Sequence, residues 1–178
     1  MPKDALAAGW ECLHVRRLAR REHFLRVGEA ATHVAFVVEG LLREHFVLAD
    51  GAERTKAFVV EGGVTGSLAD LLGDEPSRAS IVAEERSRLL VGSYADLRAL
   101  GKTFPAWERY GRRMLERLLV AKALREYELL GLDAEARYDA FSARHPGLEA
   151  RVAAHHVASY LGITPVHLSR LRRRRRER

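Results

Sequence analysis

The sequence predicts an α+β protein that begins with an antiparallel β-roll (a double-stranded β-helix) and ends with an all-α helix-turn-helix domain. Short runs of β-forming residues, divided by glycine-containing turns, fill the first half of the chain. A long helical pattern without an internal proline follows over residues 105–130. Near the C-terminal end, Gly162 separates two short helical patterns. We therefore expect a roll over residues 1–102, a long helix over 103–132 and the helix-turn-helix domain over 133–178.

The N-terminal part is expected to hold a short helix over residues 4–13 and then a series of strands. The strands are predicted over residues 15–18, 23–27, 34–38, 41–48, 55–60, 80–83 and 88–91, where β-formers gather. The dipeptide Asp50-Gly51 favours a two-residue hairpin loop between the fourth and fifth of these strands. Many short strands at close spacing, with glycine at most corners, are typical of an antiparallel barrel or roll.

Helices are expected to follow the roll, and three N-cap residues mark their starts. Ser93 is a good cap for a helix over 94–100, Thr103 for the long helix that starts near Pro105, and Asp133 for a further helix. Along the long helix, apolar or small residues recur at alternating spacings of four and three, which is typical of a coiled-coil seam. The seam residues are Trp107, Gly111, Met114, Leu118 and Ala121.

This seam predicts that the protein is a homodimer. A second stripe of the same helix, formed by Leu115, Leu119 and Lys122, is expected to face the chain's own roll. One helix cannot bury two stripes against one small domain, so the first stripe needs a partner. A long helix packed only within its own chain is the alternative.

Residues 157–172 predict the helix-turn-helix itself. Gly162 ends the first helix, because glycine adopts positive φ at little cost. Thr164 is a good N-cap for the second helix, and Pro165 fits its first turn, where a missing N–H costs nothing. The buried face of the two helices is expected to consist of Val157, Ala158, Leu161, Leu168 and Leu171.

The outward face of the second helix predicts DNA binding, because this helix of the motif enters the major groove. The residues expected to reach bases or phosphates are Thr164, Val166, His167, Ser169, Arg170, Arg173 and Arg174. The unbroken arginine run over 172–176, with Arg178 beyond it, suits phosphate binding. An ordinary helical hairpin with a solvated basic face is the alternative.

The distribution of charge favours a polyanionic partner for the C-terminal part. Residues 1–100 carry 13 Lys/Arg and 15 Asp/Glu, a net charge of −2. Residues 101–178 carry 17 Lys/Arg and 9 Asp/Glu, a net charge of +8. Each phosphate that such a surface neutralises adds affinity that salt removes.

Other functional classes lack their residue patterns. No apolar run is long enough to cross a membrane and no signal-peptide pattern follows Met1, so a cytoplasmic protein without a membrane partner is expected. The single Cys12 excludes an intrachain disulfide and a cysteine-ligated metal site made from one chain. His33 lacks the second histidine of a metal cupin, and the adjacent His155 and His156 are expected to face solvent or phosphate. Without a glycine-rich nucleotide loop, we expect no enzyme activity, no metal and no certain cofactor.

The order of these parts resembles the Crp/Fnr family of bacterial transcription regulators, and the resemblance covers essentially the whole chain. The family's roll motif of Gly-Glu, an apolar strand and Gly is matched by Gly28-Glu29, residues 36–38 and Gly40. The ending Leu161-Gly162-Ile163-Thr164-Pro165, followed by Leu168-Ser169-Arg170, is similar to a wingless subgroup of the family. The fold implied by the resemblance is the one that the residue patterns predict.

The family's phosphate-binding cassette is matched by Gly66-Ser67-Leu68-Ala69 and, after a gap, by Arg78-Ala79-Ser80. The resemblance implies that Arg78 pairs with the phosphate of a small anionic ligand. Ser67 stands where the family's glutamate holds the ribose hydroxyl of cyclic AMP. Serine is too short and carries no charge for that role, so cyclic AMP itself is not the expected ligand. The alternative is an empty cassette in which Arg78 pairs with a nearby carboxylate, from Asp70, Asp74 or Glu75.

The resemblance also implies a homodimeric, sequence-specific transcription regulator that binds a palindromic DNA operator, with RNA polymerase as a further partner. The family's base-reading positions fall on Pro165, Val166 and Arg170, of which only Arg170 can take a guanine bidentately. A bound ligand would shift the roll against the long helix. The alternative function is a ligand-binding module whose arginine-rich tail holds nucleic acid non-specifically.

Overall fold

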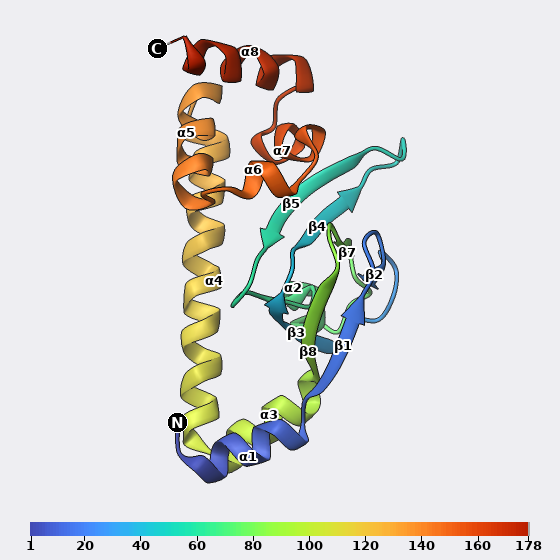
Figure 1. Ribbon diagram of the computed structural model, residues 1–178. Coiled ribbons are helices and arrows are strands. Elements are labelled where there is room, and N and C mark those ends of the chain that lie inside the picture. Colours follow the sequence, from blue (N-terminus) through green and yellow to red (C-terminus); the bar gives the residue numbers. More distant parts are fainter. Residues whose placement is uncertain (178) are drawn as a thin grey trace.

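The computed structural model describes residues 1–177, so Arg178 of the predicted phosphate-binding tail lies outside the described residues. A β-roll stands beside one long helix, and a helical domain covers one end of the roll (Figure 1). The first and last helices lie near opposite ends of the long helix (Figure 1). The predicted fold class, an antiparallel roll followed by a long helix and a helical domain, is confirmed.

Two four-stranded antiparallel sheets form the roll, with strand orders β1-β8-β3-β6 and β2-β7-β4-β5. The strands are β1 His14–Leu18, β2 His23–Leu25, β3 His33–Glu39, β4 Leu42–Val47, β5 Glu53–Val59, β6 Val64–Thr65, β7 Ala79–Ala83 and β8 Ser87–Ser93. All of the predicted strands are present. The two-residue β6 was not predicted, because so short a segment carries no period-two pattern.

The loop between β4 and β5 differs from the prediction of a two-residue turn. The Leu48 amide donates to the Ala52 carbonyl at 2.9 Å, and the Gly51 amide donates to the Leu48 carbonyl at 2.9 Å. Residues 49–51 therefore form a three-residue loop, with Gly51 at a φ of 80°. A three-residue loop of this kind needs one residue in the left-handed region, and glycine supplies it.

The helices are α1 Lys3–Glu11, α2 Leu68–Leu72, α3 Tyr94–Thr103, α4 Pro105–Gly131, α5 Ala134–Arg144, α6 Leu148–Arg151, α7 Ala154–Leu161 and α8 Pro165–Arg176. Ser93 and Asp133 cap α3 and α5 as predicted, each accepting from the amide three residues on. The prediction that Thr103 caps α4 is wrong. Its hydroxyl donates to the Ala99 carbonyl within the last turn of α3, and Phe104 occupies the cap position of α4.

The roll has its own core between the two sheets, where Leu42, Ile81 and Leu89 are fully buried. A separate core joins the C-terminal helices to the roll. The ring of Phe58, on β5, lies 5.5 Å from that of Tyr160 on α7 and 6.3 Å from that of Phe141 on α5. Because these aromatic side chains bury a large apolar area together, the helix-turn-helix domain packs directly on its own roll.

Helix α4 uses much of the predicted dimer seam for contacts within its own chain. The Trp107 indole N–H donates to the Ala5 carbonyl of α1 at 2.6 Å. Met114 packs against the small core that contains Val34, Val64 and Leu71. Further along α4, the Arg125 guanidinium donates to the Tyr160 carbonyl and lies 3.9 Å from the centre of the Tyr160 ring.

The opposite face of α4 is the exposed one, so the prediction that Leu115, Leu119 and Lys122 face the roll is wrong. Leu115 and Leu119 are 46% and 69% exposed, and Leu130 further along is 81% exposed. Both stripes of α4 have coiled-coil spacing, so spacing alone could not assign them. Trp107 and Met114 turn toward the roll because α1 and the Val34 core offer them apolar surface.

Candidate nucleic-acid interface and anion cassette

The helix-turn-helix has the local geometry that its sequence predicts. Gly162 ends α7 with a φ of 70°, and the Ile163 amide donates to the Ala158 carbonyl at 3.0 Å. The Thr164 hydroxyl accepts from the His167 amide at 3.2 Å and so caps α8. The predicted inner face is buried and consists of Val157, Ala158, Leu161, Leu168 and Leu171.

The outer face of α8 carries the predicted DNA-contacting residues. Thr164, Val166, His167, Ser169, Arg170, Arg173 and Arg174 are all exposed. Val166, a large apolar side chain, is 62% exposed. Helix α8 lies at the end of the molecule farthest from α1 and α3, so the roll does not cover this face (Figure 1). Exposed arginines on one helix face, beside exposed hydroxyl and imidazole side chains, suit contacts with phosphates and base edges.

Two arginines of the run fasten α8 to its own domain instead. Arg172 forms an ion pair with Glu149 at 3.3 Å. Arg175 forms an ion pair with Asp139 at 3.2 Å and lies 5.3 Å above the Tyr138 ring. The sequence run alone could not identify these two anchoring residues, since their partners lie on α5 and α6. They fix the orientation of α8.

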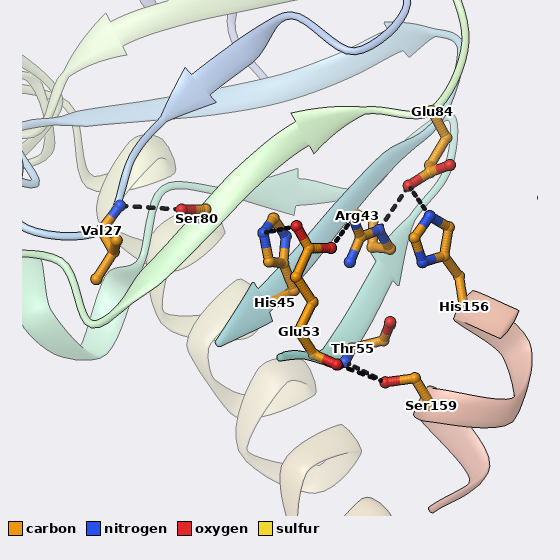
Figure 2. A network of polar contacts seen from close by, with 9 residues as sticks. All are labelled: Val27, Arg43, His45, Glu53, Thr55, Ser80, Glu84, His156 and Ser159. Carbon is orange, nitrogen blue, oxygen red and sulfur yellow. Dashed lines mark hydrogen bonds and ion pairs between the residues drawn. The ribbon is translucent and has the colours of Figure 1, made fainter. Parts of the chain in front are cut away.

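A polar network joins the roll to α7 at the edge of the shared core (Figure 2). Buried Arg43, on β4, donates to Glu84 at 2.6 Å and to Glu53 at 2.7 Å. His156 Nε2 of α7 lies 3.5 Å from Glu84 Oε1, and His45 Nε2 lies 3.4 Å from Glu53 Oε1. We call these five residues the interdomain cluster. Its charged centre lies on the roll, and α7 covers it.

Burial is the main cause that lowers the pKa of His156, to about 4, and the positive charge of Arg43 acts in the same direction. His156 is therefore neutral at pH 7. The prediction that His156 faces solvent or phosphate is wrong, because its side chain is 16% exposed and turns toward Glu84. Its neighbour His155 is exposed as predicted. Arg43 and Glu84 were not identified from the sequence. The three consecutive polar residues at 43–45, inside predicted strand 41–48, were the available signal of a polar cluster.

Further polar contacts hold the helix-turn-helix domain on the roll. The Thr55 amide of β5 donates to the Ser159 hydroxyl at 2.9 Å, and that hydroxyl donates to the Glu53 carbonyl at 3.3 Å (Figure 2). Arg151 of α6 donates to both Glu61 and Glu85. The hydrogen bonds from Arg151 lower the pKa of Glu61 to about 2. The domain interface therefore combines an apolar centre with paired charges.

The predicted cassette is folded around the start of α2. Gly66 has a φ of 151°, and a Cβ there would come within 2.5 Å of the His33 carbonyl oxygen. Ser67 is buried in the left-handed conformation with a φ of 50°. Leu68 and Ala69 begin α2. The backbone of this turn is therefore closely fitted to β3, and the cassette is held by its neighbours.

Asp70 joins the two halves of the cassette. Ser67 Oγ donates to Asp70 Oδ2 at 2.7 Å, and Arg78 Nε lies 2.5 Å from Asp70 Oδ1. Ala79 and Ser80, at the start of β7, are buried, and the Ser80 hydroxyl accepts from the Val27 amide at 3.0 Å (Figure 2). Of the predicted ligand residues, the structure thus brings Ser67 and Arg78 together and engages Ser80 in the roll.

Two other kinds of feature are absent from residues 1–177. No group of three or more His, Cys, Asp or Glu residues there is arranged to hold a metal ion. In the same range, no helix is both long and apolar enough to cross a membrane. Cys12 is a free, half-buried thiol.

Comparisons with known proteins agree with this architecture. FixK2 from Bradyrhizobium japonicum superposes with a TM-score of 0.79 at 21% identity, over 91% of this chain and 83% of that chain. The c-di-GMP responsive global regulator CLP of Xanthomonas campestris gives a TM-score of 0.77 at 17% identity, over 99% and 92% of the two chains. The catabolite activator protein of Thermus thermophilus superposes with a TM-score of 0.61 at 24% identity, over 99% of this chain and 84% of that chain. These likenesses show a shared fold.

A search of curated proteins found no match. The sequence profile of the cyclic nucleotide-binding domain matches residues 15–104, from β1 to the start of α4. The predicted resemblance to Crp/Fnr-type proteins is confirmed by this match together with the shared fold. Because the profile matches half of the chain, the chain belongs to the cyclic nucleotide-binding domain family.

Proposed function

We propose that this protein is a homodimeric transcription regulator of the Crp/Fnr type that binds a specific palindromic DNA sequence. The single observation that carries the proposal is helix α8, whose outer face is basic, exposed and uncovered by the roll. A helix presented in this way after a glycine turn fits the major groove of DNA. The chain shares its fold with FixK2 and with the global regulator CLP, which supports this proposal.

Arg170 is the proposed base-reading residue. It is exposed in the middle of α8, and its guanidinium can form two parallel hydrogen bonds to guanine O6 and N7. His167 and Ser169 are proposed neighbours to bases or phosphate. Arg173 and Arg174, one turn further along, are proposed phosphate contacts.

The proposed dimer forms through α4. The expected seam from Trp107 to Ala121 is partly engaged with α1 and the roll, so the exposed apolar face carries the main contact. That face consists of Leu119, Val120, Ala123, Tyr127 and Leu130. An exposed apolar stripe on a long helix is unfavourable in water and is buried when a second copy packs against it. Two α8 helices held in this way would enter successive major grooves about 34 Å apart.

RNA polymerase is the proposed further partner. The proposed location is the cytoplasm, where both RNA polymerase and DNA are found. The roll has no proposed enzymatic role. The proposed regulation acts on the contact between the roll and the helix-turn-helix domain, since both elements share one core.

Selection of random duplex DNA by the full-length protein tests the proposal. The expected result is one enriched palindrome, with half-sites one helical turn apart, that resists excess competitor DNA. If the protein bound all sequences of the pool with equal affinity, the proposal would be overturned. That result would favour the alternative function, a ligand-binding module that holds nucleic acid non-specifically. The matched variant Arg170→Ala should enrich a motif with one relaxed position in each half-site, whereas Arg54→Ala, on the exposed edge of β5, should enrich the parent motif.

A further inference from the structure

Three hydrogen-bond donors of the cassette converge on one carboxylate, that of Asp70. The Ser67 hydroxyl donates to Oδ2 at 2.7 Å, and the Arg78 backbone amide donates to the same oxygen at 3.0 Å. The Arg78 Nε–H donates to Oδ1 at 2.5 Å. The Asp70 side chain is only 5% exposed, although that of Arg78 is 72% exposed.

This donor set has the chemistry of an oxoanion site. A guanidinium N–H, a backbone N–H and a hydroxyl are the groups that hold phosphates in proteins, and charged donors make the stronger bonds. Here all three donate to a carboxylate of the same chain. The ligand that the family implies, a cyclic nucleotide, needs the same guanidinium for its phosphate, and Ser67 cannot supply the glutamate contact to the ribose. The residues present therefore do not fit that ligand.

Asp70 is also difficult to displace. Its own carbonyl accepts from the Glu75 amide at 2.9 Å, and the Gly73 amide donates to the Ala69 carbonyl at 3.1 Å, so the loop between Asp70 and Arg78 is pinned. A carboxylate held in this way competes at an effective concentration in the millimolar range or above. Burial alone would raise the pKa of Asp70, but the hydrogen bonds from Arg78 and Ser67 outweigh it and lower that pKa, which keeps the group charged. A phosphate that entered beside it would meet a like charge.

We propose that Asp70 is a built-in occupant of the anion position of the cassette, so that the roll takes neither cyclic nucleotides nor inorganic phosphate. The cassette is then fixed in one state by the chain itself. This inference does not depend on the proposed recognition of DNA. It predicts that neutralising Asp70 uncovers an anion site made of Arg78 and Ser67.

Isothermal titration of the full-length protein with cyclic AMP, cyclic GMP and inorganic phosphate tests the proposal. The parent protein should show no saturable binding up to about 1 mM of each probe, the range in which the tethered carboxylate competes. Asp70→Asn should bind at least one probe about tenfold or more tightly than the parent does, since a charge-assisted site becomes free. Asp74→Asn is the matched control, because Asp74 is an exposed carboxylate of the same loop with a φ of 55° that asparagine also tolerates. It should behave like the parent.

Three results would overturn the proposal. They are micromolar binding of a probe by the parent, a folded Asp70→Asn that binds no better than the parent, and a double variant with Arg78→Gln that binds as well as Asp70→Asn alone. If Asp70→Asn fails to fold, the nitrogen NMR signal of Arg78 Nε in the parent protein, followed during a titration with phosphate, tests the proposal instead. That signal should stay fixed up to about 1 mM phosphate, the range in which the tethered carboxylate competes. A saturable shift of the signal would contradict the proposal.

Discussion

His156 of α7 lies with its Nε2 3.5 Å from Oε1 of Glu84, the oxygen that also accepts from Arg43. Glu84 thus sits between a buried arginine of the roll and a neutral imidazole of the helix-turn-helix domain. The two domains therefore meet over this carboxylate. The relationship also makes the stability of the interface sensitive to charge and to pH.

Replacing Arg43 should be strongly destabilising. Arg43→Met leaves Glu53 and the nearly buried Glu84 without their guanidinium partner, and breaking a buried pair costs about 3–5 kcal/mol. The free energy of unfolding in urea, for variant and parent at pH 7, measures the loss. Arg54→Ala, an exposed arginine in the neighbouring strand, is the control and should change stability by less than about 0.5 kcal/mol. A loss below about 1 kcal/mol for Arg43→Met would mean that the cluster is not a buried ion pair in solution.

Stability should rise with pH between about 4 and 6.5 in part through His156. Its pKa in the folded chain is about 4, against an ordinary 6.5, so the unfolded chain binds more protons between these values. The contribution is fully present above pH 6.5 and is lost as the pH falls toward 4. Burial also lowers the pKa of His45 and His145, which adds to the same slope.

His156→Gln removes this titration and should flatten the slope by about 2–3 kcal/mol over that interval. Urea unfolding of variant and parent at several pH values between about 4 and 7.5, a range that spans this window, gives the comparison. Identical slopes for the two proteins would show that His156 is solvated, and that α7 does not rest on the cluster as described.

Local features of this fold were predictable because they depend on neighbours in the chain. The caps Ser93, Asp133 and Thr164 each accept from the amide three residues on, which short sequence patterns specify. The positive φ of Gly162 is another such feature. The strands could likewise be found from β-forming runs between turns.

Choices among distant partners could not be predicted in the same way. Arg78 had three candidate carboxylates among residues 70–75, and only the folded chain shows that it pairs with Asp70. The two stripes of α4 have the same spacing, so their assignment needed the position of Trp107 against α1. The pairing of Arg43 with Glu84 spans 41 residues, and no local pattern specifies it.

The two kinds of arginine on α8 should respond differently to replacement. Arg170→Ala should lower affinity for the selected operator by about 1–3 kcal/mol and relax one base position, because a bidentate base contact is lost. Arg174→Ala should weaken all sequences alike and reduce the slope of log affinity against log salt by about 1, as expected for one phosphate. Fluorescence anisotropy with matched and mismatched duplexes at several salt concentrations measures both. Equal loss on every sequence for Arg170→Ala would reassign it to the phosphate backbone.

A charge placed on the exposed face of α4 should separate the two protomers. In Val120→Glu with Tyr127→Glu, two carboxylates per chain would face each other across the proposed seam, where apolar contact now favours association. Sedimentation should give about twice 20.0 kDa for the parent and a single 20.0 kDa unit for the double variant. Lys102→Glu, an exposed charge change on α3 and therefore outside that face, is the control and should leave the dimer intact. A monomeric parent would exclude the proposed dimer. A double variant that remains dimeric would show that the two protomers contact each other through the seam that begins at Trp107 instead.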